Sequence, residues 1–351
     1  NIFGSIGDSA PDRWGRVLMR RAESQRARAA SETPRTLGEV DFLLGVSDEA
    51  RQGALRFSED PDGPFLASDG HRPIPPLVDL PRLLSATERY LDEEENADDL
   101  RLLLVPGSSL GGARPKASVR DNDGQLAVAK FPYKNDENNV VVWEAVAFAL
   151  AERAGLSVPS WRLLDISGSR VLLTRRFDRI LKTRIPFLSA MSMLQARDND
   201  PRSYLEIADA LRRYGAEPTV DLSQLWRRIV FSILISNTDD HLRNHGFIYE
   251  RQKGWRLSPA YDLSPTPIEI KPRILTTTID LDNGTASLDL ALSVRQDFRL
   301  SLEDGKAIIK EVGLAVSRWR DVAQLHVLSE REIDRMASAF EHADTDFASN
   351  L

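Results

Sequence analysis

Residues 238–245, TDDHLRNH, give the strongest chemical signal in the sequence. They follow the run IVFSILI at 229–235, which is too apolar to be anything but a buried helix, so the polar segment begins where that helix reaches the surface. Asp239 and Asn244 have the D-x-x-x-x-N spacing of a phosphotransfer catalytic loop. Transfer of a phosphoryl group to a hydroxyl requires a carboxylate near the acceptor and oxygen ligands for Mg²⁺. The segment therefore predicts phosphotransfer, with Asp239 as the catalytic base.

A second carboxylate follows two predicted strands. Asp262 lies in the sequence AYDL, and the strands GFIYE and WRLS separate it from Asn244. In protein kinases the same order brings the Asn and the metal-binding Asp of D-F-G together around the metal, so we expect Asn244 and Asp262 to lie close together. Amide and carboxylate oxygens suit Mg²⁺, a hard cation that also binds phosphate oxygens and water. Asn244 and Asp262 are therefore the predicted magnesium ligands.

A glycine-rich loop precedes a lysine in the amino-terminal half. The loop PGSSLGGARPK at 106–116 contains Gly111 and Gly112, and Lys130 ends the second strand of the hairpin that follows. Glycines have no Cβ and permit close approach of phosphates, while a lysine on the strand reaches those phosphates as a point charge. Each feature alone is a weak signal. Their order along the chain, ending in D-x-x-x-x-N and a further Asp, favours nucleotide-dependent phosphotransfer.

The histidines of the same polar segment support an alternative. His241 and His245 are spaced i, i+4 beside Asp239 and Asp240, and on a helix they could hold a divalent metal for hydrolysis. However, no glutamate stands between them as in H-E-x-x-H, and Asn237-Thr238 indicates a break in the helix. We expect His245 to brace the loop through backbone hydrogen bonds, and we place His241 among the cofactor-contacting candidates. The hydrolytic metal site is the less favoured reading.

The last strand of the amino-terminal half supplies two further candidates. Arg175 and Phe177 lie at its end, where a hinge to the adenine of a nucleotide would lie, although Phe177 also fits a core position. Glu144 lies on the predicted helix 137–154, where it would pair with the strand lysine; an ordinary exposed glutamate fits the pattern equally well.

These residues are expected on an α+β fold with two lobes, because 351 residues exceed what one hydrophobic core usually organises. The amino-terminal half is expected to contain helices at 8–30, 36–44 and 79–90, a strand at 101–106, hairpins at 117–131 and 161–177, and the helix 137–154. The carboxy-terminal half is expected to contain helices at 200–215, from Asp221 as cap to 235, at 303–313 and at 329–342. The predicted domains are a β-rich lobe at 1–177 and a mostly helical lobe at 178–351.

The composition excludes several classes of protein. The absence of cysteine excludes disulfides, thiolate nucleophiles and cysteine-ligated metals, and it fits the cytoplasm. A net charge of −7 argues against a global electrostatic grip on nucleic acid. No apolar run approaches the ~18 residues that span a bilayer, so we predict a cytoplasmic protein without a membrane segment. The chain begins at Asn1 rather than Met, and we expect native sequence to precede it.

Six ordered motifs resemble the HipA family, the serine/threonine kinase toxins of bacterial toxin–antitoxin pairs. The motifs are SSLGGARPK, AVAKFP, EAVAFALAERAGLSVP, LLTRRFDR, NTDDHLRNHGF and LSPAYDLSP, and the leading GDSAPDRWGR also resembles the family. The resemblance implies a protein-kinase-like two-lobed fold and phosphorylation of a protein on Ser or Thr with ATP and Mg²⁺. By motif, Lys130 would contact ATP, Asp239 would be the base, and Asn244 with Asp262 would hold Mg²⁺. Ser109 aligns with the serine that these kinases autophosphorylate.

The same resemblance implies partners. The better-known family targets are aminoacyl-tRNA synthetases, and the usual partner is a small DNA-binding HipB-like antitoxin, through which the toxin reaches DNA only indirectly. Two departures affect partner and substrate identity: much of the family's amino-terminal subdomain is expected to be absent, and Arg114-Pro115 replaces a common Gln-Glu pair. The alternatives are a catalytically silent subunit of a repressor complex and a small-molecule or lipid kinase, since the phosphotransfer residues do not specify the acceptor.

Overall fold

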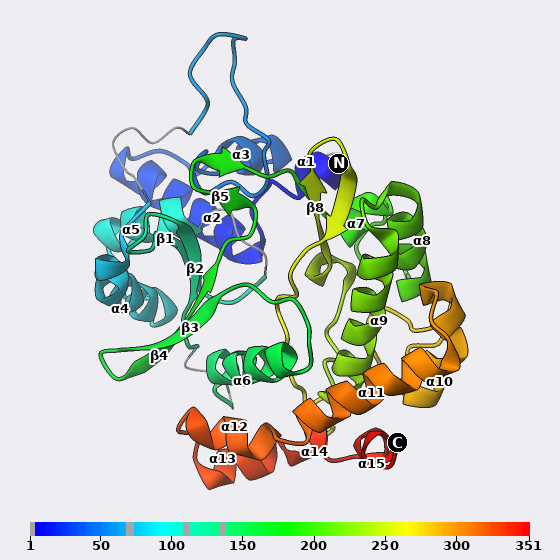
Figure 1. Cartoon of the computed structure of the whole chain (residues 1–351). Helices are drawn as coiled ribbons and strands as arrows, with labels where there is room; N and C mark the ends of the chain where they lie inside the picture. Colours follow the sequence, from blue (N-terminus) through cyan, green and yellow to red (C-terminus); the bar gives the residue numbers. More distant parts are fainter. Residues whose placement is uncertain (1–3, 68–73, 108–111, 134–135, 137) are drawn as a thin grey trace. The chain divides into compact units, whose positions relative to one another are not determined.

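The computed structural model describes residues 4–67, 74–107, 112–133, 136 and 138–351. The chain divides into two compact units (Figure 1). The first unit comprises Asn1–Glu137 and Ser160–Phe187, and the second comprises Asn138–Pro159 and Leu188–Leu351. Each unit therefore contains two separate stretches of sequence.

A four-stranded antiparallel sheet forms the centre of the first unit. Its strands are β1 (Lys116–Arg120), β2 (Leu126–Lys130), β3 (Trp161–Ile166) and β4 (Ser169–Arg175), in the order β1-β2-β4-β3. Both predicted hairpins are confirmed, and Gly124 and Gly168 adopt positive φ angles of 80° and 85° in their turns. Two short strands, β5 (Arg179–Ile180) and β6 (Thr183–Arg184), form a separate ribbon.

Helices cover one face of this sheet (Figure 1). Every second residue of the central strands is buried against α2 (Arg13–Ala29), α4 (Leu80–Leu91) and α5 (Ala97–Gly107). The sheet residues in this core are Ala117, Val119, Ala127, Ala129, Val171 and Leu173. The alternation of the pleat sends the neighbouring side chains, Lys130 among them, to the other face. The remaining elements of the unit are α1 (Gly4–Gly7), α3 (Glu39–Leu44) and η1 (Leu77–Asp79).

The prediction of a strand at 101–106 is wrong, because these residues belong to α5. Asn96 starts the helix: its side-chain oxygen accepts from the backbone N–H of Asp98 at 2.8 Å and of Asp99 at 3.0 Å. Leu100 and Leu103, three residues apart, are buried on one side of the helix. A short apolar run suits a strand and a buried helix equally, and here the cap and the i, i+3 spacing decide.

The second unit is mostly helical. Its helices are α6 (Val140–Arg153), α7 (Ala190–Met193), α8 (Tyr204–Tyr214), α9 (Pro218–Leu234), α10 (Leu288–Val294), α11 (Leu302–Val316), α12 (Trp319–Leu325), α13 (Glu330–Arg335), α14 (Ala337–Phe340) and α15 (Ala343–Ser349). The strands β8 (Gly246–Glu250) and β9 (Gly254–Leu257) form a sheet with β7 (Phe187–Ser189), and η2 (Leu242–Asn244) and η3 (Arg295–Phe298) are single 3₁₀ turns. Among the described residues, no helix is long and apolar enough to cross a membrane.

Several helix boundaries follow from the local sequence. Gly155 ends α6 with φ 74°, as predicted. Asp221 does not cap α9, because the helix begins at Pro218 and the Asp221 carboxylate is buried against Arg256 at 2.9 Å. The helix predicted at 329–342 is two short helices, α13 and α14, which meet at Met336.

Candidate active site

The polar segment after α9 is fixed by its backbone and by Asn237. The helix ends at Leu234, and Ser236 has a φ angle of 51°, so the predicted break in the helix is present. Asn237 is fully buried; its Oδ1 accepts from the backbone N–H of Ser264 at 3.1 Å, and its Nδ2 donates to Ser232 Oγ at 3.3 Å. This amide therefore joins the end of α9 to the segment that contains Asp262.

Asp239 presents its carboxylate to solvent while its backbone is held. Its side chain is 68% exposed, and Lys271 Nζ lies 3.6 Å from its Oδ1. The Asp239 carbonyl accepts from Asn244 Nδ2 at 3.1 Å and from the His241 N–H at 2.9 Å. An accessible carboxylate on a bonded backbone can orient an acceptor hydroxyl and take its proton.

Asp240, the next residue, has the opposite environment. It is buried, it accepts from the Tyr204 hydroxyl and from Ser232 Oγ at 3.2 Å, and its Oδ1 lies 3.1 Å from His245 Nε2. Burial alone would raise the pKa of Asp240, but His245 and the two hydroxyl donors hold this pKa below its usual range. Burial and the Asp240 charge raise the pKa of Tyr204 well above its ordinary value. Asp240 therefore anchors the loop.

Asn244 and Asp262 lie on segments that the β8–β9 hairpin brings together. Tyr261, next to Asp262, donates its hydroxyl to the carbonyl of Arg243, next to Asn244, at 2.6 Å. The Asn244 amide nitrogen is engaged with Asp239, which leaves the side-chain oxygen, the atom that a hard cation binds. Asp262 has a φ angle of 54°, a left-handed conformation that costs energy in a residue with a Cβ and is common at functional sites.

The two histidines of the segment play different structural parts. His245 is buried, its side chain pairs with that of Asp240, and its backbone carbonyl accepts from the Ala190 N–H at 2.7 Å. His241 is half-buried, and its Nδ1 has no hydrogen-bond partner among the described residues. Only the 3₁₀ turn η2 separates them, and the described part of the chain contains no group of three or more His, Cys, Asp or Glu that could hold a metal. The hydrolytic alternative gains no support.

Lys130 ends β2 in the first unit, on the sheet face opposite to the helices. The β1–β2 register places it directly across from Lys116, so both lysines share a face. Gly112 has a φ angle of 106°, and a Cβ there would lie 2.6 Å from Lys116 Nζ. Gly111 and Ser109 lie outside the described residues. In the second unit, Glu144 of α6 is 7% exposed, so it is not an ordinary surface glutamate.

Arg175 and Phe177 lie at the end of β4, as expected. Arg175 is exposed and pairs with Asp123 in the β1–β2 turn. It lines a cavity of about 360 Å³ together with Trp161 of β3. Since Leu172 pairs with Lys130, Arg175 points to the opposite face of the sheet from that lysine. Phe177 is half-buried, with its ring centroid 6.2 Å from that of Phe187. A nucleotide contact at this strand end stays a prediction.

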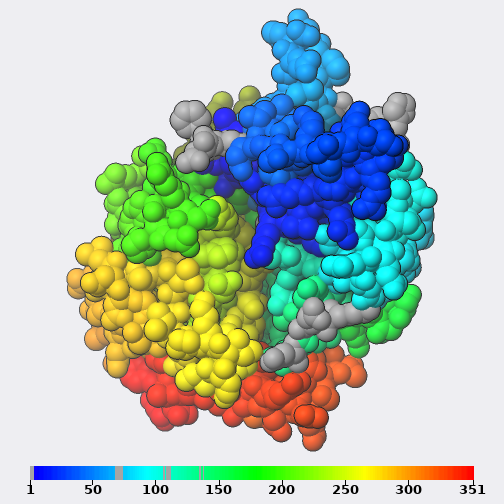
Figure 2. All heavy atoms as spheres, turned by 180° about the vertical axis from the view of Figure 1, so that it is seen from behind, coloured from blue at the N-terminus to red at the C-terminus, as the bar shows by residue number. Residues whose placement is uncertain are grey.

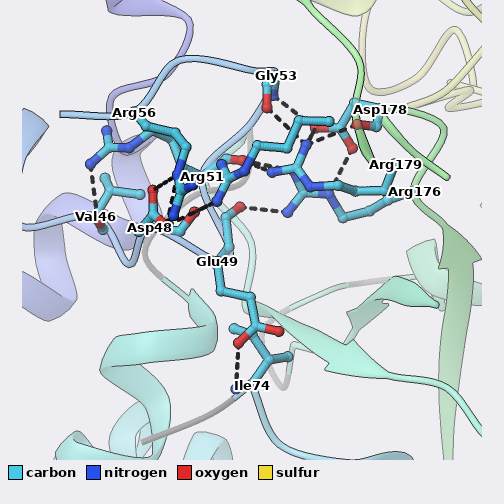
Figure 3. A network of polar contacts seen from close by, with 12 residues as sticks. Val46, Asp48, Glu49, Arg51, Gly53, Arg56, Ile74, Arg176, Asp178 and Arg179 are labelled. Atoms are coloured by element: carbon cyan, nitrogen blue, oxygen red, sulfur yellow. Dashed lines mark hydrogen bonds and ion pairs between the residues drawn. The ribbon is translucent and has the colours of Figure 1, made fainter. Parts of the chain in front are cut away.

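A polar cluster in the first unit, buried except at the exposed Arg56 and the half-buried Arg184, was not expected from the sequence; we name it the arginine network (Figure 3). Its members are Asp48, Arg51, Arg56, Arg176, Asp178, Arg179 and Arg184. Arg176 makes a two-point contact with Asp178 at 2.9 and 2.6 Å, and Arg179 Nη1 lies 2.9 Å from the same carboxylate. Burial and the neighbouring Arg176 lower the pKa of Arg179 to about 9.

The same arginines satisfy backbone carbonyls far away in the sequence. Arg176 and Arg179 both donate to the carbonyl of Arg51, and the backbone N–H of Gly53 donates to Asp178 at 2.8 Å. Arg51 itself is 1% exposed and donates to the carbonyls of Leu43 and Val46, both at 2.9 Å. The motif RRFDR at the end of β4 is the only hint of this network that the sequence offers. It does not reveal the hydrogen-bond partners of its arginines, which lie more than a hundred residues away in the sequence.

Comparison with known proteins decides the family. A model of the HipA-like C-terminal domain matches residues 108–337, well over half of the chain. The chain belongs to the HipA-like C-terminal domain family. The matched residues begin in the glycine-rich loop and continue past the polar segment, so they include every predicted site residue.

Two curated relatives, both from Sinorhizobium fredii, carry the names "Putative kinase Y4dM" and "Putative kinase Y4mE". The first is 32% identical over 187 residues, which are 45% of this chain and 45% of the relative. The second is 27% identical over 185 residues, 45% of this chain and 42% of the relative. The match to this HipA-like chain thus spans about half the length of these relatives.

A solved structure extends the likeness to almost the whole chain. HipA from Shewanella oneidensis MR-1, determined in a complex with HipB and its operator DNA, superposes with a TM-score of 0.63. The superposition covers 95% of this chain and 84% of that protein at 14% sequence identity, so the likeness concerns the fold. The mixed fold predicted from the sequence, with antiparallel sheet in the first unit and helices in the second, is confirmed as HipA-like.

Proposed function

We propose that this chain is a protein kinase of the HipA toxin type, which transfers the γ-phosphoryl group of ATP to a Ser or Thr hydroxyl. The observation that carries the proposal is the polar segment after α9, where Asp239 is exposed on a fixed backbone and the segments of Asn244 and Asp262 are hydrogen-bonded to each other. Membership of the HipA-like family and the kinase names of the relatives support the same reaction.

The proposal gives each residue one task. Asp239 accepts the proton of the acceptor hydroxyl, and Lys130 pairs with nucleotide phosphates as a point charge. Asn244 and Asp262 would hold Mg²⁺ through their side-chain oxygens; the small number of protein ligands fits an ion that completes its coordination with phosphate and water. When bound there, Mg²⁺ would neutralise charge on the transferred group. Gly111, Gly112, Phe177 and His241 are the further nucleotide-contacting candidates. The Arg175 side chain points to the opposite face of the sheet from Lys130, so only the backbone of Arg175 stays a candidate.

The acceptor and partners are proposed by analogy with the family. The acceptor is a protein of the translation machinery such as an aminoacyl-tRNA synthetase, and the restraining partner is a HipB-like antitoxin through which DNA is reached only indirectly. The complex in which the Shewanella HipA was determined supports the antitoxin partner.

Transfer of radiolabelled phosphate from ATP to a bacterial lysate tests the proposal. The wild type should label a protein band that mass spectrometry identifies, and Asp239→Asn should reduce labelling by about 10²–10⁴-fold because the base is lost. Asp282→Asn removes another solvent-exposed carboxylate of the second unit and should label normally. Label in a lipid or small molecule would replace the protein acceptor, and no transfer by any variant would indicate a catalytically silent subunit.

Ser109 is the proposed autophosphorylation site. A phosphate adds about −1.5 to −2 charges at neutral pH, and in a loop that binds ATP phosphates this charge should repel the nucleotide. Incubation with Mg²⁺ and ATP followed by phosphosite mapping should find phosphate on Ser109 in the wild type and none in Asp239→Asn. A wild-type enzyme that labels its substrate while Ser109 stays unmodified contradicts this regulation.

A further inference from the structure

Residues 267–283, which follow Asp262 in the second unit, expose three isoleucines; we name this stretch the isoleucine segment. Ile268, Ile270 and Ile274 are 54%, 59% and 53% exposed. Single exposed apolar residues are ordinary on a protein surface, but three large ones so close in the sequence mark an interaction site. The segment belongs to the yellow to gold surface in the space-filling view (Figure 2). None of the predicted site residues lies in it, so their roles do not explain the exposed isoleucines.

Hydrogen bonds attach the isoleucine segment to the backbone beside Asp239. Lys271 Nζ donates to the backbone carbonyl of Thr238 at 3.4 Å and lies 3.6 Å from Asp239 Oδ1. The Thr276 hydroxyl and its backbone N–H donate to the same Thr238 carbonyl, at 2.9 and 3.2 Å. Two points of the segment, on either side of Ile274, are therefore held next to the proposed base.

The isoleucines lie within reach of an acceptor that places its hydroxyl at Asp239. Side chains along 274–279 are alternately outward and buried, so Ile274 and Thr276 lie on the same side of the segment. Two residues of extended chain span at most about 7 Å. A bound polypeptide also extends by about 3.3 Å per residue, so side chains two to four positions from its acceptor hydroxyl can contact the isoleucines.

The charges of the isoleucine segment favour a protein partner over a lipid surface. Anionic membranes attract clusters of Lys and Arg. The two basic residues of the segment, Lys271 and Arg273, are both paired with carboxylates of this chain. Its three acidic residues, Glu269, Asp280 and Asp282, would be repelled by anionic lipid headgroups. An apolar protein surface carries no such penalty.

We infer that the isoleucine segment is the docking surface for the acceptor, and that the acceptor is a polypeptide with apolar side chains two to four residues from its Ser or Thr. The inference rests on the proposed function, because it takes Asp239 as the base, and it deepens that function by naming the chemistry of the substrate. A small-molecule acceptor at Asp239 would leave the isoleucines in water, whereas an apolar stretch of polypeptide buries them.

A library of peptides, each with one serine and one fixed neighbouring residue, tests the inference with radiolabelled ATP. The wild type should label peptides with Ile, Leu, Val or Phe two to four residues from the serine about tenfold better than peptides with Asp, Lys or Asn there. The double variant Ile270→Ser and Ile274→Ser should lose this preference while KM for ATP changes less than about twofold. Leu314→Ser is the matched control, because Leu314 of α11 is 73% exposed and its loss should leave the preference intact.

Equal labelling of all peptides by the wild type, or an unchanged preference in the double variant, overturns the docking role. A wild-type dimer that dissociates in the double variant assigns the isoleucines to a second copy of the chain, and binding to vesicles of anionic lipid that the double variant loses assigns them to a membrane; both results reject the inference.

Binding of the same peptides without ATP separates the inference from the proposed function. If the wild type labels no peptide and no protein, the kinase proposal fails. Fluorescence anisotropy then measures the affinity for fluorescein-labelled peptides of the library. Tighter binding of the apolar peptides by the wild type than by the double variant still supports the docking surface, and equal binding rejects it.

Discussion

The arginine network and the polar segment after α9 are both dense in charge, but they use it in opposite ways. In the network, the Arg176, Asp178 and Arg179 side chains are all buried and are bonded to one another or to distant carbonyls. In the segment, Asp240 is bonded in the same manner, whereas Asp239 is open to solvent on a fixed backbone. The difference teaches that charge density alone does not mark a site. The segment differs from the network in that an accessible carboxylate, Asp239, stands next to a buried and fully engaged one, Asp240.

The largest expected effect is a loss of phosphotransfer activity, caused by a substitution at the candidate active site. Asp262→Ala removes a carboxylate that the proposal assigns to Mg²⁺, so phosphotransfer should fall by more than about a thousandfold and metal-dependent nucleotide binding should weaken. The free energy of unfolding should change much less than activity, because Asp262 is only partly buried. Steady-state kinetics and calorimetry with and without Mg²⁺ measure the two effects. Retained transfer would remove Asp262 from the site.

Substitutions in the arginine network should instead lower the free energy of unfolding. Asp178→Asn leaves Arg176 and Arg179 buried without their shared carboxylate, and breaking a buried ion pair costs about 3–5 kcal/mol of the free energy of unfolding. The exposed pair of Arg175 and Asp123 is the control, because Asp123→Asn removes a pair that water already screens and should cost much less. Urea unfolding of both variants gives the values. Similar costs at the two positions would mean that the buried ion pairs of the network do not stabilise the fold.

A smaller, pH-dependent effect is expected in the second unit. Burial, and then the nearby Arg273, lower the pKa of His342 from 6.5 to about 4. Between these values the unfolded chain binds a proton that the folded chain does not, so stability is lost as the pH falls from about 6.5 to about 4, by at most about 3 kcal/mol. His342→Gln removes the titrating imidazole. The free energy of unfolding of this variant should therefore depend less on pH than that of the wild type over that range. Parallel curves contradict the shift.

The order of elements could be predicted because its signals are local. Asn122, Asp123 and Gly124 mark a turn between two alternating runs, and the β1–β2 hairpin forms there. The run at 101–106 misled because its length suits strand and helix alike, while its helix cap, Asn96, stands several residues upstream. Local signals place the boundaries well only where a cap or a turn residue is adjacent.

The grouping of Asp239, Asn244 and Asp262 could also be predicted from the sequence, because only a local hairpin separates the last two. The choice between Asp239 and Asp240 is not local: Tyr204 and His245 engage one carboxylate and leave the other to solvent. The arginine network depends in the same way on segments far apart along the chain. Local sequence patterns do not predict which residues far apart in the chain pack against each other.

The position of α6 in the sequence has a consequence for synthesis of the protein. This helix lies between strands of the first unit but belongs to the second, and most of its surface is apolar and buried in the folded chain. Its Trp143 packs on Trp319 and Phe340, with ring centroids 6.3 and 6.0 Å away. A ribosome that adds about 5–20 residues per second reaches those partners of the order of ten seconds after α6 is made. During that interval the apolar surface of α6 is exposed on the nascent chain, because the residues that bury it have not been made. A chaperone could bind α6 at this stage.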